Sequence, residues 1–340
     1  MATTGRQPSP ELLFETINGF QRTAAIKGAI ELDLFTAIAE GANTPAALGK
    51  ARKASERGMR ILCDYLTVIG FLIKSDGRYA LTTDSATFLD KRSPAYLGTM
   101  VKFLTLPEGM IDQYKDMAAT VRKGGTTTSE EGTIAPENPI WVEFARSMMP
   151  MMVPAAQAIA SILEKELGGD GSKRVLDVAA GHGIFGITLA QRFANVEATA
   201  LDWKSVLEVA KENAKQRGVS SRFKTLPGSA FEVDPGKNFD AVLLTNFLHH
   251  FDIPTCEKLL RKFHTALKPG GTVVILEFVP NEDRVTPAMP AAFALIMLAS
   301  TPSGDAYTRT EYEAMLRNSG FSSAQFHSTP GPETVITAKA

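Results

Sequence analysis

The second half of the chain alternates short apolar runs with longer segments of helical periodicity. Strands are predicted at 175–178, 197–202, 221–227, 240–245 and 272–277, and helices at 184–193, 205–217, 255–267 and 310–319. Two final strands, 324–328 and 334–338, are joined by a short Pro-Gly-Pro turn and are expected to pair antiparallel. This alternation predicts an α/β fold with a doubly wound, Rossmann-like, mostly parallel sheet that ends in an antiparallel hairpin.

The first third of the chain has a different pattern, with apolar residues at helical spacing from Glu11 to Leu34. Thr44-Pro45 and Ser55 mark the starts of further helices. Ser75-Asp76-Gly77 then separates two short strands as a hairpin turn. The order of helix, turn, helix and two-stranded wing predicts a mostly helical winged-helix domain.

This predicted winged helix has two interpretations. Arg57 and Arg60 lie on the exposed face of its second helix, where a DNA-binding protein carries basic residues. Glu56 and Asp64 dilute that basic face, which favours a module that packs against protein instead.

The middle of the chain is predicted to be helical. One helix is expected over 93–125, and a second segment, 141–152, combines aromatic residues with methionines. That segment suits either the core of a domain interface or one wall of a pocket for a flat aromatic substrate. Glycines at 168–171 then mark a boundary. We therefore expect three parts: a winged-helix dimerisation domain (1–105), a helical connector that lines the substrate pocket (106–170) and a catalytic domain (171–340).

The overall composition narrows the function only by exclusion. Thirty-six basic residues nearly balance 37 acidic ones, so nothing favours nucleic acid or an anionic membrane as a partner. The two cysteines have no metal-ligand spacing, and the N-terminus has no basic start followed by an apolar core. We expect a cytoplasmic protein without a signal peptide.

The sequence KRVLDVAAGHGIFG, from Lys173 to Gly186, is typical of a nucleotide-binding turn. Its glycines satisfy G-x-G-x-x-G, and Asp202 follows at the spacing of a ribose-binding acid, so a dinucleotide is one candidate ligand. Asp177 inside the first strand favours the cationic sulfonium of S-adenosylmethionine (SAM) instead, because a carboxylate would repel a pyrophosphate. The terminal hairpin and His249, a proton acceptor after the fourth strand, point the same way.

These motifs together resemble the caffeate-type and acetylserotonin-type O-methyltransferases, a class I SAM-dependent family with bacterial members. The matching stretches are WVEFARSMMP, DVAAGHG, LDW, PGSAF, LLTNFLHHF, LKPGGTVVILE and GDAYTRTEYEAMLRNSGF, in that order. The resemblance implies a homodimer formed through the N-terminal domain, which also helps to close the partner's substrate pocket. It also implies that no metal is needed.

The resemblance places roles on particular residues. His249 matches the general base, with Glu277 and, by looser spacing, Asp305 as acids beside it. The residues expected to bind SAM are Asp177, Ala179, Gly181, Gly183, Asp202, Trp203, Ser229, Ala230, Phe231 and Thr245. Ser229 stands where the family usually has Asp, Thr245 where many relatives have Lys or Arg, and His250 where plant members have Asp. Candidates for substrate binding are Met148, Met152, Phe247, His250, Phe293 and Met297.

The expected reaction is in-line transfer of a methyl group to a hydroxyl of a small aromatic or polyketide-like acceptor. An imidazole near neutral pH can accept the proton of such a hydroxyl. Three alternatives remain: a SAM-binding relative with decarboxylase-type or hydroxylase-type chemistry, a dinucleotide-dependent oxidoreductase, and a winged-helix DNA-binding regulator with a ligand-sensing domain.

Overall fold

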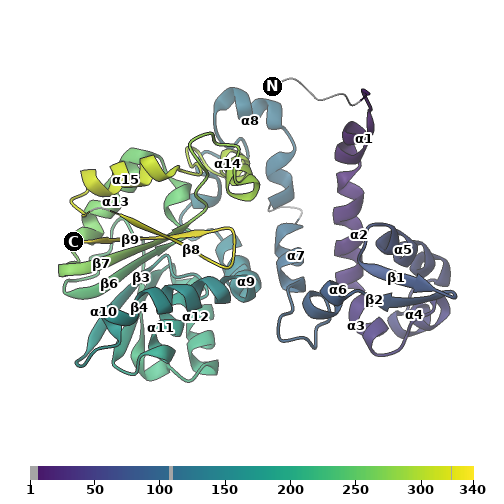
Figure 1. The fold of residues 1–340 in the computed structure, drawn as a ribbon, viewed down its shortest axis with the longest axis horizontal. Helices are drawn as coiled ribbons and strands as arrows, with labels where there is room; N and C mark the ends of the chain where they lie inside the picture. Colours follow the sequence, from purple (N-terminus) through teal and green to yellow (C-terminus); the bar gives the residue numbers. More distant parts are fainter. Residues whose placement is uncertain (1–6, 107–109, 323) are drawn as a thin grey trace. The chain divides into compact units, whose positions relative to one another are not determined.

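The computed structural model describes residues 7–106, 110–322 and 324–340 and divides the chain into two compact units. The division falls between Leu106 and Pro107. The first expected boundary, at 105/106, lies beside it. The expected connector, 106–170, falls almost entirely within the second unit. Figure 1 shows the elements of both units along the chain.

The second unit is built on a seven-stranded sheet in the order β5-β4-β3-β6-β7-β9-β8. Its strands are β3 (Lys173–Val178), β4 (Val196–Asp202), β5 (Phe223–Pro227), β6 (Phe239–Thr245), β7 (Leu267–Glu277), β8 (Gln325–Ser328) and β9 (Thr334–Lys339). The strands β3 to β7 pair in parallel, whereas β9 pairs antiparallel with both β7 and β8. The predicted doubly wound sheet and its terminal hairpin are therefore confirmed.

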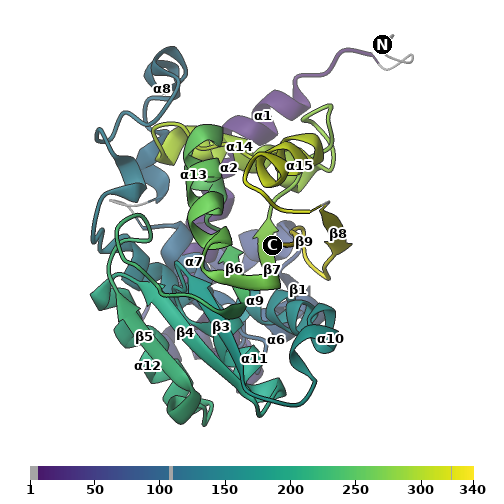
Figure 2. The ribbon, with the colours of Figure 1, turned by 90° about the vertical axis from the view of Figure 1, so that its left-hand side faces the viewer.

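Helices cover both faces of this sheet, as Figure 2 shows. The helices α9 (Ile140–Ile162), α10 (Glu164–Leu167), α11 (Ile184–Arg192) and α12 (Lys204–Gln216) pack on one face, and α13 (Ile253–His264) and α15 (Arg309–Asn318) on the other. The central strand β6 is buried along its whole length, which explains the apolar run from Ala241 to Leu244 within it. Because the five parallel strands share one direction, their carboxyl ends form a single edge of the sheet.

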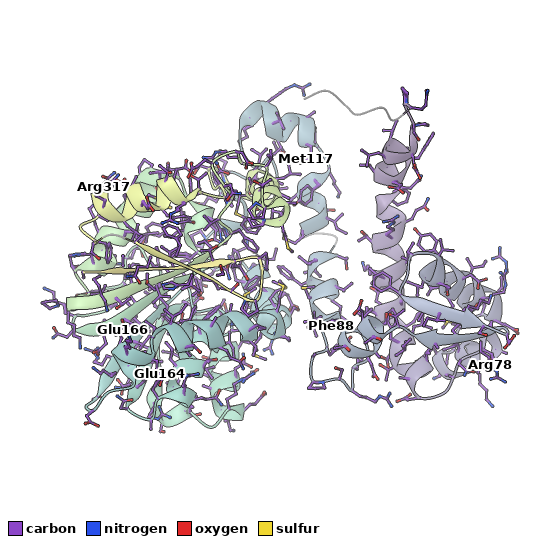
Figure 3. All side chains as sticks on the ribbon, in the orientation of Figure 1. Arg78, Phe88, Met117, Glu164, Glu166 and Arg317 are labelled. Atoms are coloured by element: carbon purple, nitrogen blue, oxygen red, sulfur yellow. The ribbon has the colours of Figure 1, made fainter. Side chains whose placement is uncertain are left out.

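The short helix α10 is tied to its neighbours by ion pairs at its surface. Glu164 pairs with Arg192 of α11, and Glu166 with Lys339 of β9 at 3.1 Å; both glutamates are labelled in Figure 3. The glycines that follow α10 therefore form a turn inside this unit, directly before β3.

The first unit is a helical domain with a two-stranded wing. It contains α1 (Glu11–Ile17), α2 (Gly19–Glu31), α3 (Leu34–Ala39), α4 (Pro45–Arg52), α5 (Glu56–Val68), β1 (Leu72–Ser75), β2 (Arg78–Leu81), α6 (Thr83–Phe88) and α7 (Gly98–Leu104). The hydroxyls of Thr44 and Ser55 cap α4 and α5 as predicted. The strands β1 and β2 form the expected hairpin.

Two surface features bear on the role of this unit. Asp64 pairs with Arg60 at 3.2 Å and with Lys74 at 2.5 Å, so the basic side chains of helix and wing are partly neutralised. By contrast, α1 and the start of α2 expose large apolar side chains, namely Leu12, Leu13, Phe14, Ile17 and Phe20. Such a contiguous apolar face is typical of a protein interaction surface.

The prediction of a single helix over 93–125 is wrong. The structure has α7, a 3-10 turn at Asp112–Tyr114 and α8 (Met117–Lys123) instead. Residues 107–109 of the expected helix lie outside the described residues. The sequence carries Pro107 there, and a proline disfavours helical backbone in the residue before it. Two further helical elements, the 3-10 turn η5 (Leu248–His250) and α14 (Ala288–Ser300), follow β6 and β7.

Candidate functional site

The turn between β3 and α11 has a backbone suited to close ligand approach. Ala179, Gly181 and Gly183 have φ angles of 51°, 57° and 73°. A positive φ is rare for alanine, and such strain is concentrated at functional sites. The N–H of Gly183 donates to Ala180 O at 2.8 Å, which closes the turn directly before the helix.

Asp177 of β3 is completely buried beneath this turn. Its Oδ2 accepts a hydrogen bond from the N–H of Gly186 at 2.9 Å. Its Oδ1 is buried and has no hydrogen-bond partner in the described part of the chain. The pKa of Asp177 is raised to about 7, chiefly by burial; the Gly186 hydrogen bond lowers it and the charge of Asp202 adds to the rise. One oxygen at this position therefore has no partner among the described residues.

Asp202, the last residue of β4, reaches the same turn. Its Oδ2 accepts from the N–H of Gly181 at 2.8 Å, and its Oδ1 from the N–H of Trp203 at 2.6 Å. Burial raises the pKa of Asp202 to about 6. Each carboxylate oxygen still has a free lone pair, so Asp202 can also accept from two hydroxyls. The Trp203 side chain packs against Ala145, Val206 and Val209.

The other residues expected to bind SAM lie at the ends of the neighbouring strands. Ser229 accepts a hydrogen bond from the N–H of Phe231 at 3.2 Å, and the Phe231 ring lies edge-on to Phe251 with centroids 5.2 Å apart. Ala230 is half-buried in the core next to this loop, and Thr245 is buried at the end of β6. Ser229, Ala230 and Phe231 therefore follow β5 at the edge of the sheet that also carries Asp202.

His249 and Glu277 form a buried pair at the same edge. Glu277 Oε2 lies 2.5 Å from His249 Nδ1. Glu277 Oε1 accepts from the N–H groups of Phe247, Leu248 and His249 at 3.0, 2.9 and 3.3 Å. Because a carboxylate only accepts, this pairing assigns an N–H to Nδ1 of His249, and Nε2 is the ring nitrogen that Glu277 does not contact.

Aromatic rings surround this histidine. Phe293 of α14 lies edge-on to His249 at 4.8 Å, and His250 lies at 4.2 Å from it. Phe278 stacks on Phe293 at 4.1 Å, and Trp141 of α9 lies 5.2 Å from His250. Burial lowers the pKa of His250 well below its usual range, and His249 lowers it further, so His250 is neutral. The arrangement offers ring faces and edges beside a base.

Asp305 meets His249 through its backbone. Its N–H donates to His249 O at 3.0 Å, whereas its carboxylate lies 3.4 Å from Arg284 and accepts from the N–H of Ala306 at 2.8 Å. Among the described interactions, none joins the Asp305 carboxylate to the His249 ring.

The remaining substrate candidates lie on three elements. Met148 and Met152 are buried on α9, and Met297 is buried on α14. Phe247 packs edge-on against Phe251 at 5.1 Å. Of the six candidates, the structure places Phe293 and His250 in ring contact with His249.

Three residues at this edge were not predicted as site residues. They are Trp141, Asn246, which follows β6, and Glu333, which precedes β9. Glu333 is buried; burial raises its pKa, and the nearby charge of Glu277 raises it further while His249 lowers it. Trp141 had a signal, since it belongs to the aromatic, Met-rich segment. Asn246 and Glu333 had none, because each is a common polar residue beside a strand.

The hydrogen-bond acceptors at this edge of the sheet fit SAM. A carboxylate with spare lone pairs, Asp202, ends β4, and the buried oxygens without partners in the described part of the chain include Asp177 Oδ1 on β3 and Asn246 Oδ1 directly after β6. Acceptors suit a ligand that brings hydroxyl, ammonium and sulfonium groups. Among the described residues, no group of three or more His, Cys, Asp or Glu side chains could hold a metal ion. None of the described helices is long and apolar enough to cross a membrane.

Comparison with known proteins agrees with the class that fold and site define, a SAM-dependent methyltransferase. The family model of the O-methyltransferase domain matches residues 144–322. The model of the O-methyltransferase dimerisation domain matches residues 14–91. The first match spans more than half of the chain, so this protein belongs to the O-methyltransferase family. It is an enzyme that uses SAM as its methyl donor.

Individual relatives extend over nearly the whole chain. A Nostoc punctiforme protein assigned as an O-methyltransferase has a solved structure that is 52% identical, covers 98% of this chain and 100% of its own, and has a TM-score of 0.94. The 3-hydroxy-5-methyl-1-naphthoate 3-O-methyltransferase of Streptomyces sahachiroi is 29% identical, over 96% of this chain and 94% of its own. Human N-acetylserotonin methyltransferase, solved with SAM, shares the fold with a TM-score of 0.84 at 23% identity, over 100% and 99% of the two chains.

Proposed function

We propose that this enzyme methylates a hydroxyl of a small aromatic or polyketide-like acceptor, with His249 as the general base. One observation carries the proposal: a buried histidine whose Nδ1 is held by Glu277 and whose ring contacts the rings of His250 and Phe293. The 29% identical Streptomyces relative carries the name of a naphthoate O-methyltransferase, which supports an aromatic acceptor.

The residues divide the work in a simple way. Asp202 would accept from the ribose hydroxyls, the turn from Ala179 to Gly183 would approach the methionine part, Trp203 would pack on the adenine, and residues 229–231 would line the adenine edge. Asp177 and Thr245 would lie behind these contacts. Bound SAM would supply an electrophilic methyl group, and these residues would hold it facing the acceptor hydroxyl.

The His249 ring would take the proton of the acceptor hydroxyl at Nε2. Glu277 fixes the tautomer and orientation of the ring and stabilises the imidazolium that forms. Asp305 would support His249 through the backbone hydrogen bond to its carbonyl oxygen. Phe293, His250 and Phe247 would contact the acceptor ring, together with the methionines Met148, Met152 and Met297.

The segment 106–170 is proposed to line this acceptor pocket through α9. Trp141 lies beside His250, and Met152 contacts Asn246. This supports a role for the connector in substrate choice, within the same compact unit as the sheet.

A homodimer through the first unit is also proposed. The exposed apolar residues of α1 and the match to a dimerisation domain support it. Light scattering after size-exclusion chromatography should give twice the chain mass. A monomer at micromolar concentration would contradict this. Cytoplasmic location and the absence of a nucleic-acid partner stay predictions from the sequence.

The test of the proposed chemistry is the variant His249→Ala. Loss of a general base should lower kcat by about 10²–10⁴-fold, with the affinity for SAM unchanged. His264→Ala is the matched control, since His264 ends α13 at the opposite edge of the sheet and should keep its turnover. One relative, 27% identical, is named an L-tyrosine C(3)-methyltransferase, so the product must be analysed. A C-methylated product, or full activity of His249→Ala, would refute the proposal.

A further inference from the structure

Asn246 is the first residue after β6, the strand that lies between β3 and β7 in the sheet. Its N–H donates to Leu276 O at 2.8 Å, which continues the ladder between β6 and β7 beyond the strand end. Its φ is 51°. Asparagine tolerates this left-handed region better than most residues, but the strain still has to be maintained by the surrounding structure.

The side-chain amide of Asn246 is oriented by a methionine. Its Nδ2 donates to Met152 Sδ at 3.4 Å. A thioether sulfur can accept a hydrogen bond but cannot donate one, so the NH2 group faces Met152 and the carbonyl oxygen Oδ1 faces away. That oxygen is buried, and no donor in the described part of the chain reaches it.

A buried acceptor without a partner is costly and rare in folded proteins. The orientation of this amide by Met152 suggests that Oδ1 is kept available. On the sheet, β6 lies between β3, which leads to the cofactor turn, and β7, which ends in Glu277. Both substrates are expected at this edge of the sheet, so each brings a candidate donor for this oxygen.

We propose that Asn246 Oδ1 accepts a hydrogen bond from a substrate in the loaded enzyme. The donor is either the ammonium group of SAM or the hydroxyl group of the methyl acceptor. Asn246 is then a positioning residue for the reaction. This inference rests on the proposed function, because it assumes that both substrates meet at the carboxyl edge of the sheet.

The test compares Asn246→Ala with a matched control, Asn238→Ala. Asn238 precedes β6 at its other end, is exposed and has a φ of 66°. Both substitutions therefore place alanine in the same strained backbone region, and only Asn246→Ala removes the buried oxygen. Asn246→Gly removes the oxygen without backbone strain and serves if the alanine variant does not fold.

Two measurements separate the two donors. Calorimetry with SAM alone reports on the ammonium group, and the KM of a phenolic acceptor at saturating SAM reports on the hydroxyl. We expect one of the two constants to rise about tenfold in Asn246→Ala or Asn246→Gly, which is the typical effect of one lost hydrogen bond. Asn246→Asp keeps an acceptor oxygen and should restore the affected constant to within about threefold of the wild type. Asn238→Ala should leave both constants unchanged.

The proposal is overturned if Asn246→Ala and Asn246→Gly change both constants by less than about twofold relative to Asn238→Ala. The oxygen would then serve only the fold or hold a water molecule. Failure of the proposed function is distinguishable from this result, since the wild type would then bind no SAM or methylate no phenol.

Discussion

Two groups of carboxylates at the carboxyl edge of the sheet differ in how many hydrogen-bond partners the protein itself gives them. One is Glu277 at the end of β7, and the other is Asp202 and Asp177 beside the glycine turn. Glu277 has four partners, with three backbone N–H groups on Oε1 and the His249 ring on Oε2. Among the described residues, Asp202 has one backbone partner per oxygen, and Asp177 has a single partner, on Oδ2. The proposed base is thus assembled before any ligand binds, whereas the proposed cofactor end retains acceptors that a ligand can use.

Among the substitutions at this edge, the largest loss of stability and activity is expected at Glu277. Glu277→Ala leaves three backbone donors and a buried ring nitrogen without their partner, so it should lower the free energy of unfolding by about 3–5 kcal/mol. Methyl transfer should fall by about 10²–10⁴-fold in the fraction that folds, because His249 loses its orientation. Urea unfolding and single-turnover assays measure the two effects.

Glu277→Gln separates these two roles of the carboxylate. The amide keeps a carbonyl oxygen for the backbone donors, but its NH2 group cannot accept the Nδ1 proton of His249. We expect most of the stability to return without the activity. Wild-type turnover in Glu277→Gln would contradict the pairing of Glu277 with the base.

A smaller effect, on cofactor binding alone, is expected at Asp202. Asp202→Asn should weaken SAM binding by about 10–100-fold, because hydrogen bonds to a charged acceptor contribute about 1.5–3 kcal/mol. Asp234→Asn, at an exposed aspartate in the loop before β6, is the matched control and should bind SAM normally. If Asp202→Asn binds as well as the wild type, the assignment of Asp202 to the ribose fails.

The pH dependence of SAM binding adds a second check on Asp202. Burial raises its pKa to about 6, so the ligand-free protein protonates this carboxyl as the pH falls from 7 to 5. Protonation removes an acceptor, and the affinity of the wild type for SAM should drop over this range. The affinity of Asp202→Asn should depend less on pH.

Asp177 gives a prediction on stability. Its pKa of about 7 in the folded protein lies above the ordinary 3.8, so the folded state holds a proton that the unfolded chain has released. The resulting stabilisation is fully present below about pH 4 and is lost as the pH rises through 7. Between pH 5 and pH 8 the wild type should lose about 1–3 kcal/mol more free energy of unfolding than Asp177→Asn. Equal slopes in urea titrations would mean that Asp177 is not protonated in the fold.

The comparison of Glu277 with Asp202 and Asp177 also shows how much of the fold and of the candidate site could be predicted from the sequence. Strand ends follow from apolar runs and glycine turns, so the placement of Asp202, His249 and Glu277 at one edge was predictable. The pairing of His249 with Glu277 was expected from the resemblance to the O-methyltransferase family, and in the structure β6 and β7 are adjacent strands that end at the same level.

Side-chain direction was not predictable in the same way. Asn246 gains its importance from a positive φ and from the position of Met152, 94 residues earlier in the chain. Glu333 approaches Glu277 only because β9 inserts beside β7, which pairs Thr334 with Glu277. Such contacts depend on tertiary packing that local sequence patterns do not encode.

Substitution of Asp305 is expected to have the smallest effect on activity. It tests whether a second carboxylate, besides Glu277, assists His249. Its carboxylate and Arg284 are both more than two-fifths exposed, and such surface pairs contribute about 0–1 kcal/mol. Asp305→Asn keeps the backbone N–H that binds His249 O, so kcat should change less than about threefold.

The preceding residue, Gly304, provides the contrast to Asp305→Asn. A Cβ there would lie 2.3 Å from His249 O, so Gly304→Ala should displace the histidine backbone and cost about 1–3 kcal/mol of stability with a clear loss of turnover. If Asp305→Asn instead loses as much activity as His249→Ala, the carboxylate itself assists the base. Glu277, whose Oε2 already holds Nδ1 of the ring, would then share that task with Asp305.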